Sequence, residues 1–131
     1  MIDHTGVPVS DYARSKAFYE KLFAPIGASL LMEVTPEQTG DGSWAGGFGR
    51  DGKPSFWIGN DARGVAAHTH IAFVTDSRAK VDAFHAAGLA AGGRDNGAPG
   101  LRPHYHANYY AAFVIGPDGH NIEVVCHKPE V

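Results

Sequence analysis

Two histidines and one glutamate have the residue types and the placement of an open metal site. His4 lies in the segment IDHTGVPV, His70 opens the similar segment HIAFVT in the second half of the chain, and Glu123 interrupts the apolar run NIEVVC. Two imidazoles and one carboxylate bind a divalent cation and leave about three coordination positions for water or substrate. A metal held in this way acts as a Lewis acid on an oxygen-bearing substrate. We therefore predict one divalent ion (Fe, Mn, Ni or Zn) bound by His4, His70 and Glu123.

Strand alternation is the reason for choosing these three residues. Successive side chains of a strand point to opposite faces of the sheet. Three apolar pairs are expected to pack under helices: Val7 with Val9, Ile71 with Phe73, and Ile122 with Val124. His4, His70 and Glu123 then share the opposite, concave face. A carboxylate on a largely apolar strand is costly unless it is paired or bound to metal.

Other residues could serve as ligands of the same site. His68 has the parity of His70, but it corresponds to Ile2 in the first half of the chain, so His70 is preferred. His127 has the parity of Glu123 and lies at the end of its strand. When the turns of the two halves are aligned, Phe56 takes the place of Glu123, so the first half supplies no carboxylate there. The predicted site therefore has three protein ligands.

The two halves of the chain repeat one another. The offset that aligns His4 with His70 also aligns four helix or cap residues: Ala13 with Ala79, Ala17 with Ala83, Phe18 with Phe84, and Gly27 with Gly93. An offset larger by one aligns Gly49, Asp51 and Gly52 with Gly116, Asp118 and Gly119. Each copy would be marginally stable alone, so the two should share a core or a sheet. We predict a single domain over residues 1–131, with one module at about 1–60, a linker at 61–67 and a second module at about 68–131.

Each module is predicted to have the order β-α-β-β-β. In the first module the pattern indicates strands at 2–9, 29–34, 44–50 and 55–59, a helix at about 11–24 and a polar loop at 35–42. Ser10 or Asp11 is the expected helix cap. In the second module it indicates strands at 69–75, 109–115 and 121–126, a helix at about 77–88 capped by Asp76 or Ser77, an uncertain strand near Ala90, and a Gly/Pro-rich loop at 94–103.

A polar, aromatic segment in the second module is the candidate for binding and proton transfer. The run RPHYHANYY covers residues 102–110. Histidine titrates near neutral pH, so His106, with Tyr109, is assigned a catalytic acid–base role. Substrate binding is assigned to Arg102, His104 and Tyr110, together with Trp44 of the first module. The competing interpretation is ordinary strand packing for the tyrosines and core packing for Trp44.

Composition narrows the classes of function. The net charge of −3 gives no footprint for nucleic acid. No apolar run approaches the ~20 residues that span a bilayer. The single cysteine, Cys126, rules out an internal disulfide framework and is interpreted as structural. His85 and His120 are expected to be solvated. We expect a cytoplasmic protein with a small-molecule substrate and neither a nucleic-acid nor a membrane partner.

The opening IDHTGVPVSDYARSKAFYEKLF and the closing GPDGHNIEVVCH resemble the vicinal oxygen chelate superfamily. That superfamily includes glyoxalase I, bleomycin-resistance proteins, extradiol dioxygenases and fosfomycin-resistance thiol transferases. The resemblance implies an α+β fold of two tandem βαβββ modules that form a curved sheet round a metal cavity. It places the metal ligands at His4, His70 and Glu123, and it implies a homodimer in which modules pair within or across chains. Glyoxalase I has a fourth ligand where this chain has Phe56.

These expectations lead to one favoured function and two alternatives. The favoured function is a divalent-metal-dependent enzyme that acts on a small oxygen-chelating substrate by lyase- or isomerase-like proton transfer. The first alternative is a metal-free drug-binding protein of the bleomycin-resistance type. The second is an extradiol-type ring-cleaving dioxygenase, which requires Fe(II) or Mn(II).

Overall fold

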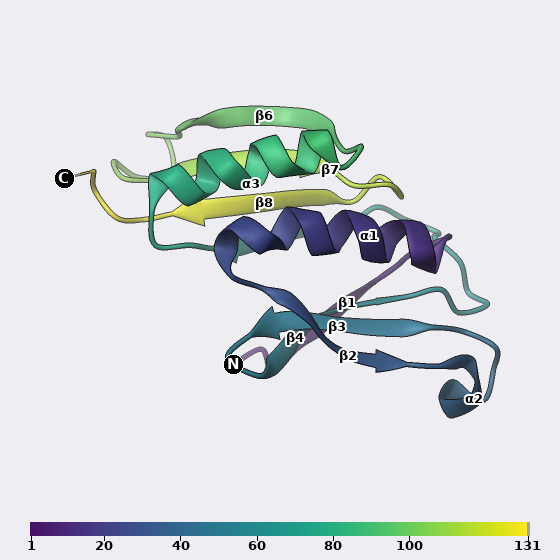
Figure 1. The fold of residues 1–131 in the computed structure, drawn as a ribbon. Helices are drawn as coiled ribbons and strands as arrows, with labels where there is room; N and C mark the ends of the chain where they lie inside the picture. Colours follow the sequence, from purple (N-terminus) through teal and green to yellow (C-terminus); the bar gives the residue numbers. More distant parts are fainter. Residues whose placement is uncertain (131) are drawn as a thin grey trace.

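The computed structural model describes residues 1–130 and contains two four-stranded sheets and two long helices (Figure 1). The first module contains β1 (Thr5–Pro8), α1 (Tyr12–Phe23), the 3-10 turn η1 (Ala24–Ile26), β2 (Ser29–Val34), the short helix α2 (Pro36–Thr39), β3 (Ala45–Arg50) and β4 (Lys53–Gly59). The second contains β5 (His70–Val74), α3 (Arg78–Ala90), β6 (Arg94–Leu101), β7 (Tyr110–Ile115) and β8 (Asn121–Cys126).

The two sheets have the same topology. The strand orders are β1-β4-β3-β2 and β5-β8-β7-β6. In each sheet the first strand of the module pairs in parallel with the last, and the remaining pairs are antiparallel. This arrangement confirms the predicted α+β class and the βαβββ order of both modules. The sheets are separate, and the parallel pair in each is what brings the first and last strands of a module side by side.

Both long helices begin at the caps that the sequence offered. The side chain of Asp11 accepts the N–H of Arg14, and that of Ser77 accepts the N–H of Lys80. Such caps satisfy backbone donors that have no partner within the helix. η1 ends at Gly27, whose φ of +78° suits a residue without a side chain. Among residues 1–130, no helix has the length and apolar character needed to cross a membrane.

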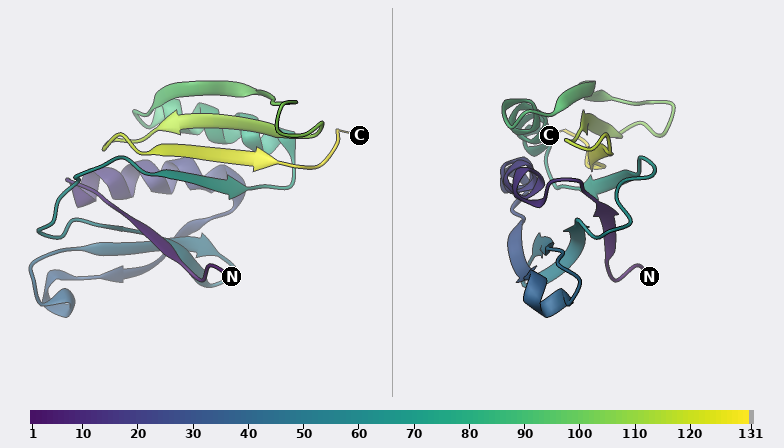
Figure 2. Two further views of the ribbon diagram at one scale, coloured as in Figure 1. Left: turned by 180° about the vertical axis from the view of Figure 1, so that it is seen from behind. Right: turned by 90° about the vertical axis from the view of Figure 1, so that its right-hand side faces the viewer.

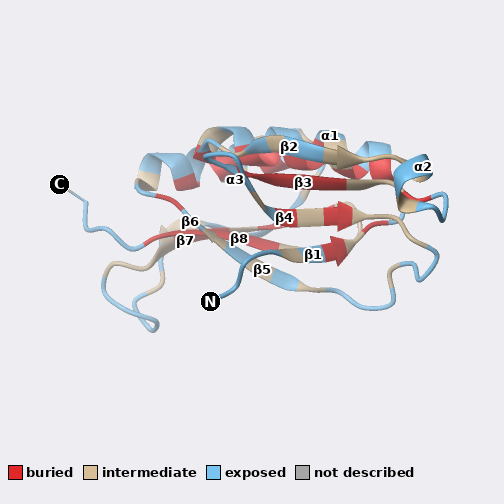
Figure 3. Cartoon of the chain, turned by 90° about the horizontal axis from the view of Figure 1, so that it is seen from below, coloured by how far each residue is buried: buried red, intermediate tan, exposed pale blue. Residues whose placement is uncertain are grey.

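One hydrophobic core joins the two modules. Helices α1 and α3 lie side by side on the same side of the sheets (Figure 2). They approach closely because Gly88 has no side chain, and a Cβ there would lie 2.8 Å from Leu22. The rings of Phe56 and Phe73 pack edge to face at 5.2 Å and link β4 to β5. The central strands β3 and β8 are accordingly the buried ones, whereas β5 is largely exposed (Figure 3).

Four sequence-based assignments are wrong. The polar loop predicted at 35–42 contains the short helix α2. The predicted loop at 94–103 is largely strand β6, whose register is interrupted by bulges on both sides of Gly97. Bulges and an edge position explain how a strand tolerates this glycine and Pro99. The strand predicted near Ala90 is the last turn of α3. The first strand starts at Thr5 rather than at residue 2, because residues 1–4 are exposed and pair with no strand.

Candidate functional site

Glu123 is a carboxylate held inside the second sheet. It lies in β8, level with Ala72 of β5 and Phe113 of β7. Its neighbours in sequence, Ile122 and Val124, belong to the core under the helices, so Glu123 points to the opposite face. Its side chain is only 5% exposed. A carboxylate at such a depth needs partners that satisfy its charge.

His70 is the first of these partners. Its Nδ1 lies 3.0 Å from the carbonyl oxygen of Asn121, and because a carbonyl can only accept, Nδ1 carries a proton. Its Nε2 lies 3.0 Å from Oε1 of Glu123. In the neutral ring this nitrogen is also an acceptor, so two lone pairs face each other across the gap. A cation bound beside both atoms would be held by these two lone pairs.

Tyr109 is the second partner of the carboxylate. It precedes β7, and its hydroxyl donates to Oε2 of Glu123. Burial, followed by this hydrogen bond, raises the pKa of Tyr109 to about 12. The hydroxyl is therefore protonated at neutral pH and remains a donor. His70 and Tyr109 thus hold one oxygen each of the same carboxylate.

A pair of histidines extends the cluster beyond Tyr109. The Nδ1 of His106 accepts the N–H of Asn108, so its Nε2 carries the proton in the neutral ring. That Nε2 lies 2.7 Å from Nδ1 of His127. Both imidazoles meet the ring of Tyr109 edge to face, at centroid distances of 5.4 Å. The reserve ligand His127 therefore lies beside the predicted acid–base residue His106.

Arg102 and His104 border the same face. The guanidinium of Arg102 donates to the carbonyls of Ala98 and Gly100 and stacks over the ring of Phe113 at 5.5 Å. Phe113 is the register partner of Glu123 and also stacks on His70, so Arg102 is positioned at the edge of the cluster. The imidazole of His104 packs on Tyr105 at 4.2 Å.

Three predicted site residues lie elsewhere. His4 precedes β1, is 61% exposed and bonds Asp3 at 2.7 Å. Trp44 stacks on Tyr12 in the first module at 5.6 Å. Tyr110 turns to the helix side of its sheet, where its hydroxyl donates to Asp82 of α3 at 2.7 Å. Within the described part of the chain, no three His, Cys, Asp or Glu side chains gather closely enough to hold a metal ion. One chain thus brings His70 to Glu123 but does not bring His4 to them.

The strand register corrects the residue that matches Glu123 in the first module. In the repeat His70 corresponds to His4, so Ile71 corresponds to Thr5; Thr5 pairs with Phe56, and Ile71 pairs with Ile122. Phe56 is therefore the counterpart of Ile122 and is buried in the core. The counterpart of Glu123 is Trp57, which was not among the predicted site residues. The residue offset that aligns His4 with His70 also aligns Trp57 with Glu123. Applying that offset to the last strands would therefore have identified Trp57.

The two histidines expected to be solvated are both engaged. His120 is fully buried, accepting the N–H of Thr69 at Nδ1 and donating from Nε2 to the carbonyl of Pro8. His85 has a side chain only 12% exposed and bonds Asp95. Each histidine is bonded to residues of other structural elements. Local sequence patterns of turns and helices do not reveal such tertiary contacts. Cys126 is a buried free thiol.

The comparisons with known proteins agree with this fold. The family model of the Glyoxalase/Bleomycin resistance protein/Dioxygenase superfamily matches residues 1–124. A crystal structure of a glyoxalase/bleomycin resistance protein from Albidiferax ferrireducens T118 is 29% identical, with a TM-score of 0.73, and the match covers 94% of this chain and 96% of that one. A glyoxylase/bleomycin resistance protein/dioxygenase domain from Frankia sp. EAN1pec is 15% identical, with a TM-score of 0.75 and 98% of both chains covered.

Glyoxalase I from Zea mays is 21% identical, with a TM-score of 0.72, and the match covers 95% of this chain but 45% of the maize chain. At such identities the maize and Frankia structures show likeness of fold alone. No curated protein matches the sequence significantly. The chain belongs to the Glyoxalase/Bleomycin resistance protein/Dioxygenase superfamily.

Proposed function

We propose that this protein is a divalent-metal-dependent enzyme that catalyses a lyase- or isomerase-like proton transfer on a small oxygen-chelating substrate. One observation carries the proposal: Nε2 of His70 faces Oε1 of Glu123 at 3.0 Å while Nδ1 is committed to a backbone carbonyl. The imidazole is thus oriented with a free lone pair toward a buried carboxylate. Metal-binding histidines are held in the same way, with the other ring nitrogen bonded to a backbone carbonyl or carboxylate.

The donor set fits a divalent first-row metal. One imidazole nitrogen and one carboxylate oxygen suit Fe, Mn, Ni or Zn. In residues 1–130, Glu123 has no lysine or arginine as an ion-pair partner, so the buried charge has no resident cation apart from a protonated histidine. A bound metal would supply that charge and stabilise negative charge that develops on substrate oxygens.

The third ligand in this proposal is His4 of a second copy of the chain. His4 is exposed, lies outside the strand and uses Nδ1 for its bond to Asp3, so Nε2 remains to bind a metal held by another molecule. The proposal therefore includes a homodimer in which each metal site draws His70 and Glu123 from one chain and His4 from the other. It keeps the three ligands that strand parity predicts.

The remaining residues of the cluster have separate roles. The hydroxyl of Tyr109 donates a hydrogen bond to Oε2 of Glu123 and fixes the carboxylate. His106 and His127 share a proton between two nitrogens 2.7 Å apart, which makes His106 the residue that moves a proton to or from the substrate. Arg102, at the edge of the cluster, is placed to bind an anionic group of the substrate.

Metal analysis of protein purified without chelators tests the proposal. We expect one divalent ion per chain, and at least about 100-fold weaker binding in His70→Ala and Glu123→Ala. His85→Ala, a histidine of α3 outside the cluster, is the matched control and should keep its metal. Metal-free protein that binds aromatic drugs with wild-type affinity in both variants would instead make this a binding protein.

Mixing two defective chains tests the dimer. His4→Ala and Glu123→Ala proteins should each fail to bind metal, whereas a heterodimer of the two should regain one site of the two. No recovery in verified heterodimers would rule out the shared site. Among metal-loaded enzymes, oxygen consumption with a catechol would favour the ring-cleaving alternative over proton transfer.

A further inference from the structure

The two modules meet at two equivalent joints, and only one of them is closed. At the first joint, the turn before β8 packs on the end of β1, where His120 donates to the carbonyl of Pro8 at 2.7 Å. The carbonyl of Val74, at the end of β5, is the counterpart of that of Pro8 in the repeat. Its partner is Nη2 of Arg50, at 3.5 Å. The second joint is therefore held by a much longer contact.

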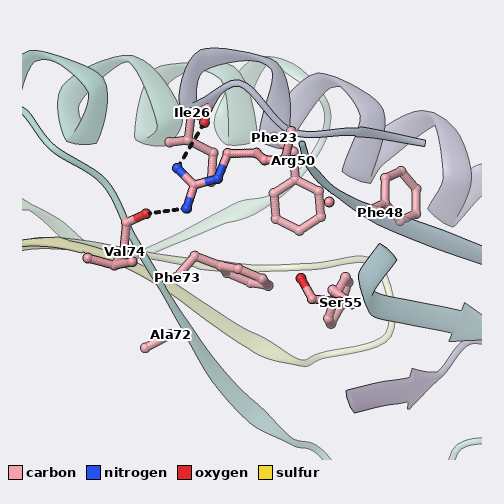
Figure 4. A pocket seen from close by; sticks show the side chains of 11 residues that line it. Phe23, Ile26, Phe48, Arg50, Ser55, Ala72, Phe73 and Val74 are labelled. Carbon is pink, nitrogen blue, oxygen red and sulfur yellow. Dashed lines mark hydrogen bonds between the residues drawn. The ribbon is translucent and has the colours of Figure 1, made fainter. Parts of the chain in front are cut away.

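A cavity of about 240 Å³ occupies this second joint (Figure 4). Its lining comes from the end of α1, η1, the β3–β4 hairpin and β5. Most of the lining residues have apolar side chains, among them Phe23, Ile26, Phe48, Phe56, Phe73 and Val74, and the polar side chains are Arg50 and Ser55. An apolar cavity of roughly 150 Å³ is enough to bind benzene in another protein. A one-ring organic molecule therefore fits in the space between the modules.

Arg50 gives this cavity a charge. Among residues 1–130, the contacts of its guanidinium are those with the carbonyls of Val74 and Ile26, the latter at 3.4 Å. Both distances exceed the roughly 2.9–3.0 Å typical of N–H···O bonds. No carboxylate in residues 1–130 forms an ion pair with it. A guanidinium has five N–H donors, so at least three remain for a ligand. Its fork geometry matches a carboxylate in particular.

We propose that this cavity binds a small aromatic monocarboxylate, with the ring against the partly exposed Phe73 and the carboxylate on Arg50. Apolar walls with one well-placed polar group are typical of small-molecule sites. At the closed first joint, the buried His120 from the turn before β8 fills the position that corresponds to this cavity. His70 and Glu123 do not line the cavity, although Ala72, the register partner of Glu123, does, and binding there requires no metal.

Benzoate, with benzamide as its neutral counterpart, tests the proposal in an NMR titration of the isotope-labelled full chain. Benzoate should bind at least fivefold more tightly than benzamide and shift the backbone amides of Ala28, Arg50 and Val74. Arg50→Gln should weaken benzoate about tenfold and leave benzamide unchanged. Arg94→Gln removes the same charge from an exposed position of β6 and should bind benzoate as the wild type does.

Filling the cavity provides an independent variant. Ser55 lines it from β4, and Ser55→Leu should weaken benzoate and benzamide alike, at least fivefold. If Arg50→Gln does not fold, Arg50→Lys, which keeps the charge but not the fork, should bind benzoate about threefold more weakly. The proposal is wrong if benzoate binds Ser55→Leu with wild-type affinity, or if the shifts gather at His70 and Glu123.

Discussion

Equivalent positions in the two sheets hold different kinds of side chain, an indole in the first module and a carboxylate in the second. The register matches three pairs of residues: Gly6 with Ala72, Gly47 with Phe113, and Trp57 with Glu123. In the first sheet a large indole lies between two glycines, and a Cβ at Gly47 would come within 2.8 Å of it. In the second sheet a small carboxylate lies under His70 and Tyr109. A duplicated fold can therefore keep its backbone while one copy loses the polar site.

Each module also contains a tyrosine that donates to a glutamate, and these pairs differ in their cations. In the first module Tyr12 donates to Glu33, whose carboxylate lies 3.1 Å from Nζ of Lys16. These two hydrogen bonds, that of Tyr12 first, lower the pKa of Glu33. In the second module Tyr109 donates to Glu123, and no lysine accompanies it among residues 1–130. Glu123 is therefore the glutamate without an ammonium group beside it, and it is the one to which we assign the proposed metal.

The hairpin turns give the largest expected difference between the modules. Asp118 is nearly buried and accepts the backbone N–H and the hydroxyl of Ser10, whereas Asp51, its counterpart in the first turn, is exposed. We expect Asp118→Asn to lower the free energy of unfolding by about 2–3 kcal/mol, because hydrogen bonds to a charged acceptor are lost. Asp51→Asn should change it by less than about 0.5 kcal/mol. Urea unfolding measures both, and equal effects would mean that the joint adds no stability.

A second prediction concerns the glycine beneath Trp57. Gly47→Ala should cost about 2 kcal/mol of unfolding free energy, because the new methyl group meets the indole and Pro54 at 2.8–2.9 Å. In a Trp57→Ala background the same change should cost under about 1 kcal/mol, because most of the contact is gone. A double-mutant cycle in urea compares the two. An equal cost in both backgrounds would show that the indole does not require this glycine.

The sequence predicted most of the fold because its signals are local. Strand alternation and polar caps located α1, α3 and most of the strands, whereas β6 was missed because Gly97 and Pro99 are typical of loops and its pairing with β7 is a tertiary contact. The buried His120 was missed for the same reason, since its partner Pro8 lies far away in the sequence.

The candidate site was predicted in part. Strand parity brought His70 and Glu123 to one face, where the structure has them in contact. It misplaced His4 because residues 1–4 leave the sheet. It matched Phe56 with Glu123 because the β3–β4 hairpin has a bulge beside Gly49, so the turns align at an offset one larger than the strands do. Bulges depend on strand pairing, and sequence spacing alone does not reveal them.

A third prediction, which depends on the proposed metal site, concerns Trp57, the counterpart of Glu123 in the first module. Trp57→Glu places a second carboxylate where the repeat has Glu123, and in the proposed dimer it would face the shared metal. We expect about tenfold tighter binding of a divalent ion, because affinity rises with the number of charged ligands. Trp57→Gln is the control for the lost indole. Equal affinities in the two variants, measured by calorimetry, would show that the sheets do not face each other across a metal.

The smallest expected effect is a change in the pKa of two tyrosines of the second module. It distinguishes the contribution of burial to each pKa from that of hydrogen bonding. The pKa of Tyr109 is raised to about 12 mainly by burial and then by Glu123, whereas that of Tyr110 is raised to about 12 mainly by its hydrogen bond to Asp82. Glu123→Gln should therefore lower the pKa of Tyr109 less than Asp82→Asn lowers that of Tyr110. Carbon-13 NMR of labelled tyrosine rings reads each value directly.

The same shifts fix the direction of the pH dependence. The unfolded chain releases a tyrosine proton near pH 10, below the folded pKa of Tyr109 at about 12, so the stability that Tyr109 contributes is complete below pH 10 and is lost as the pH rises toward 12. Tyr109→Phe should flatten the fall in unfolding free energy over that range. Glu123→Gln should lower the pH at which this loss of stability is complete, because it lowers the pKa of Tyr109 in the folded protein and leaves that in the unfolded chain unchanged. If Tyr109→Phe leaves the slope unchanged, the tyrosine is not buried against Glu123 in solution, and the contrast with Trp57 would then rest on His70 alone.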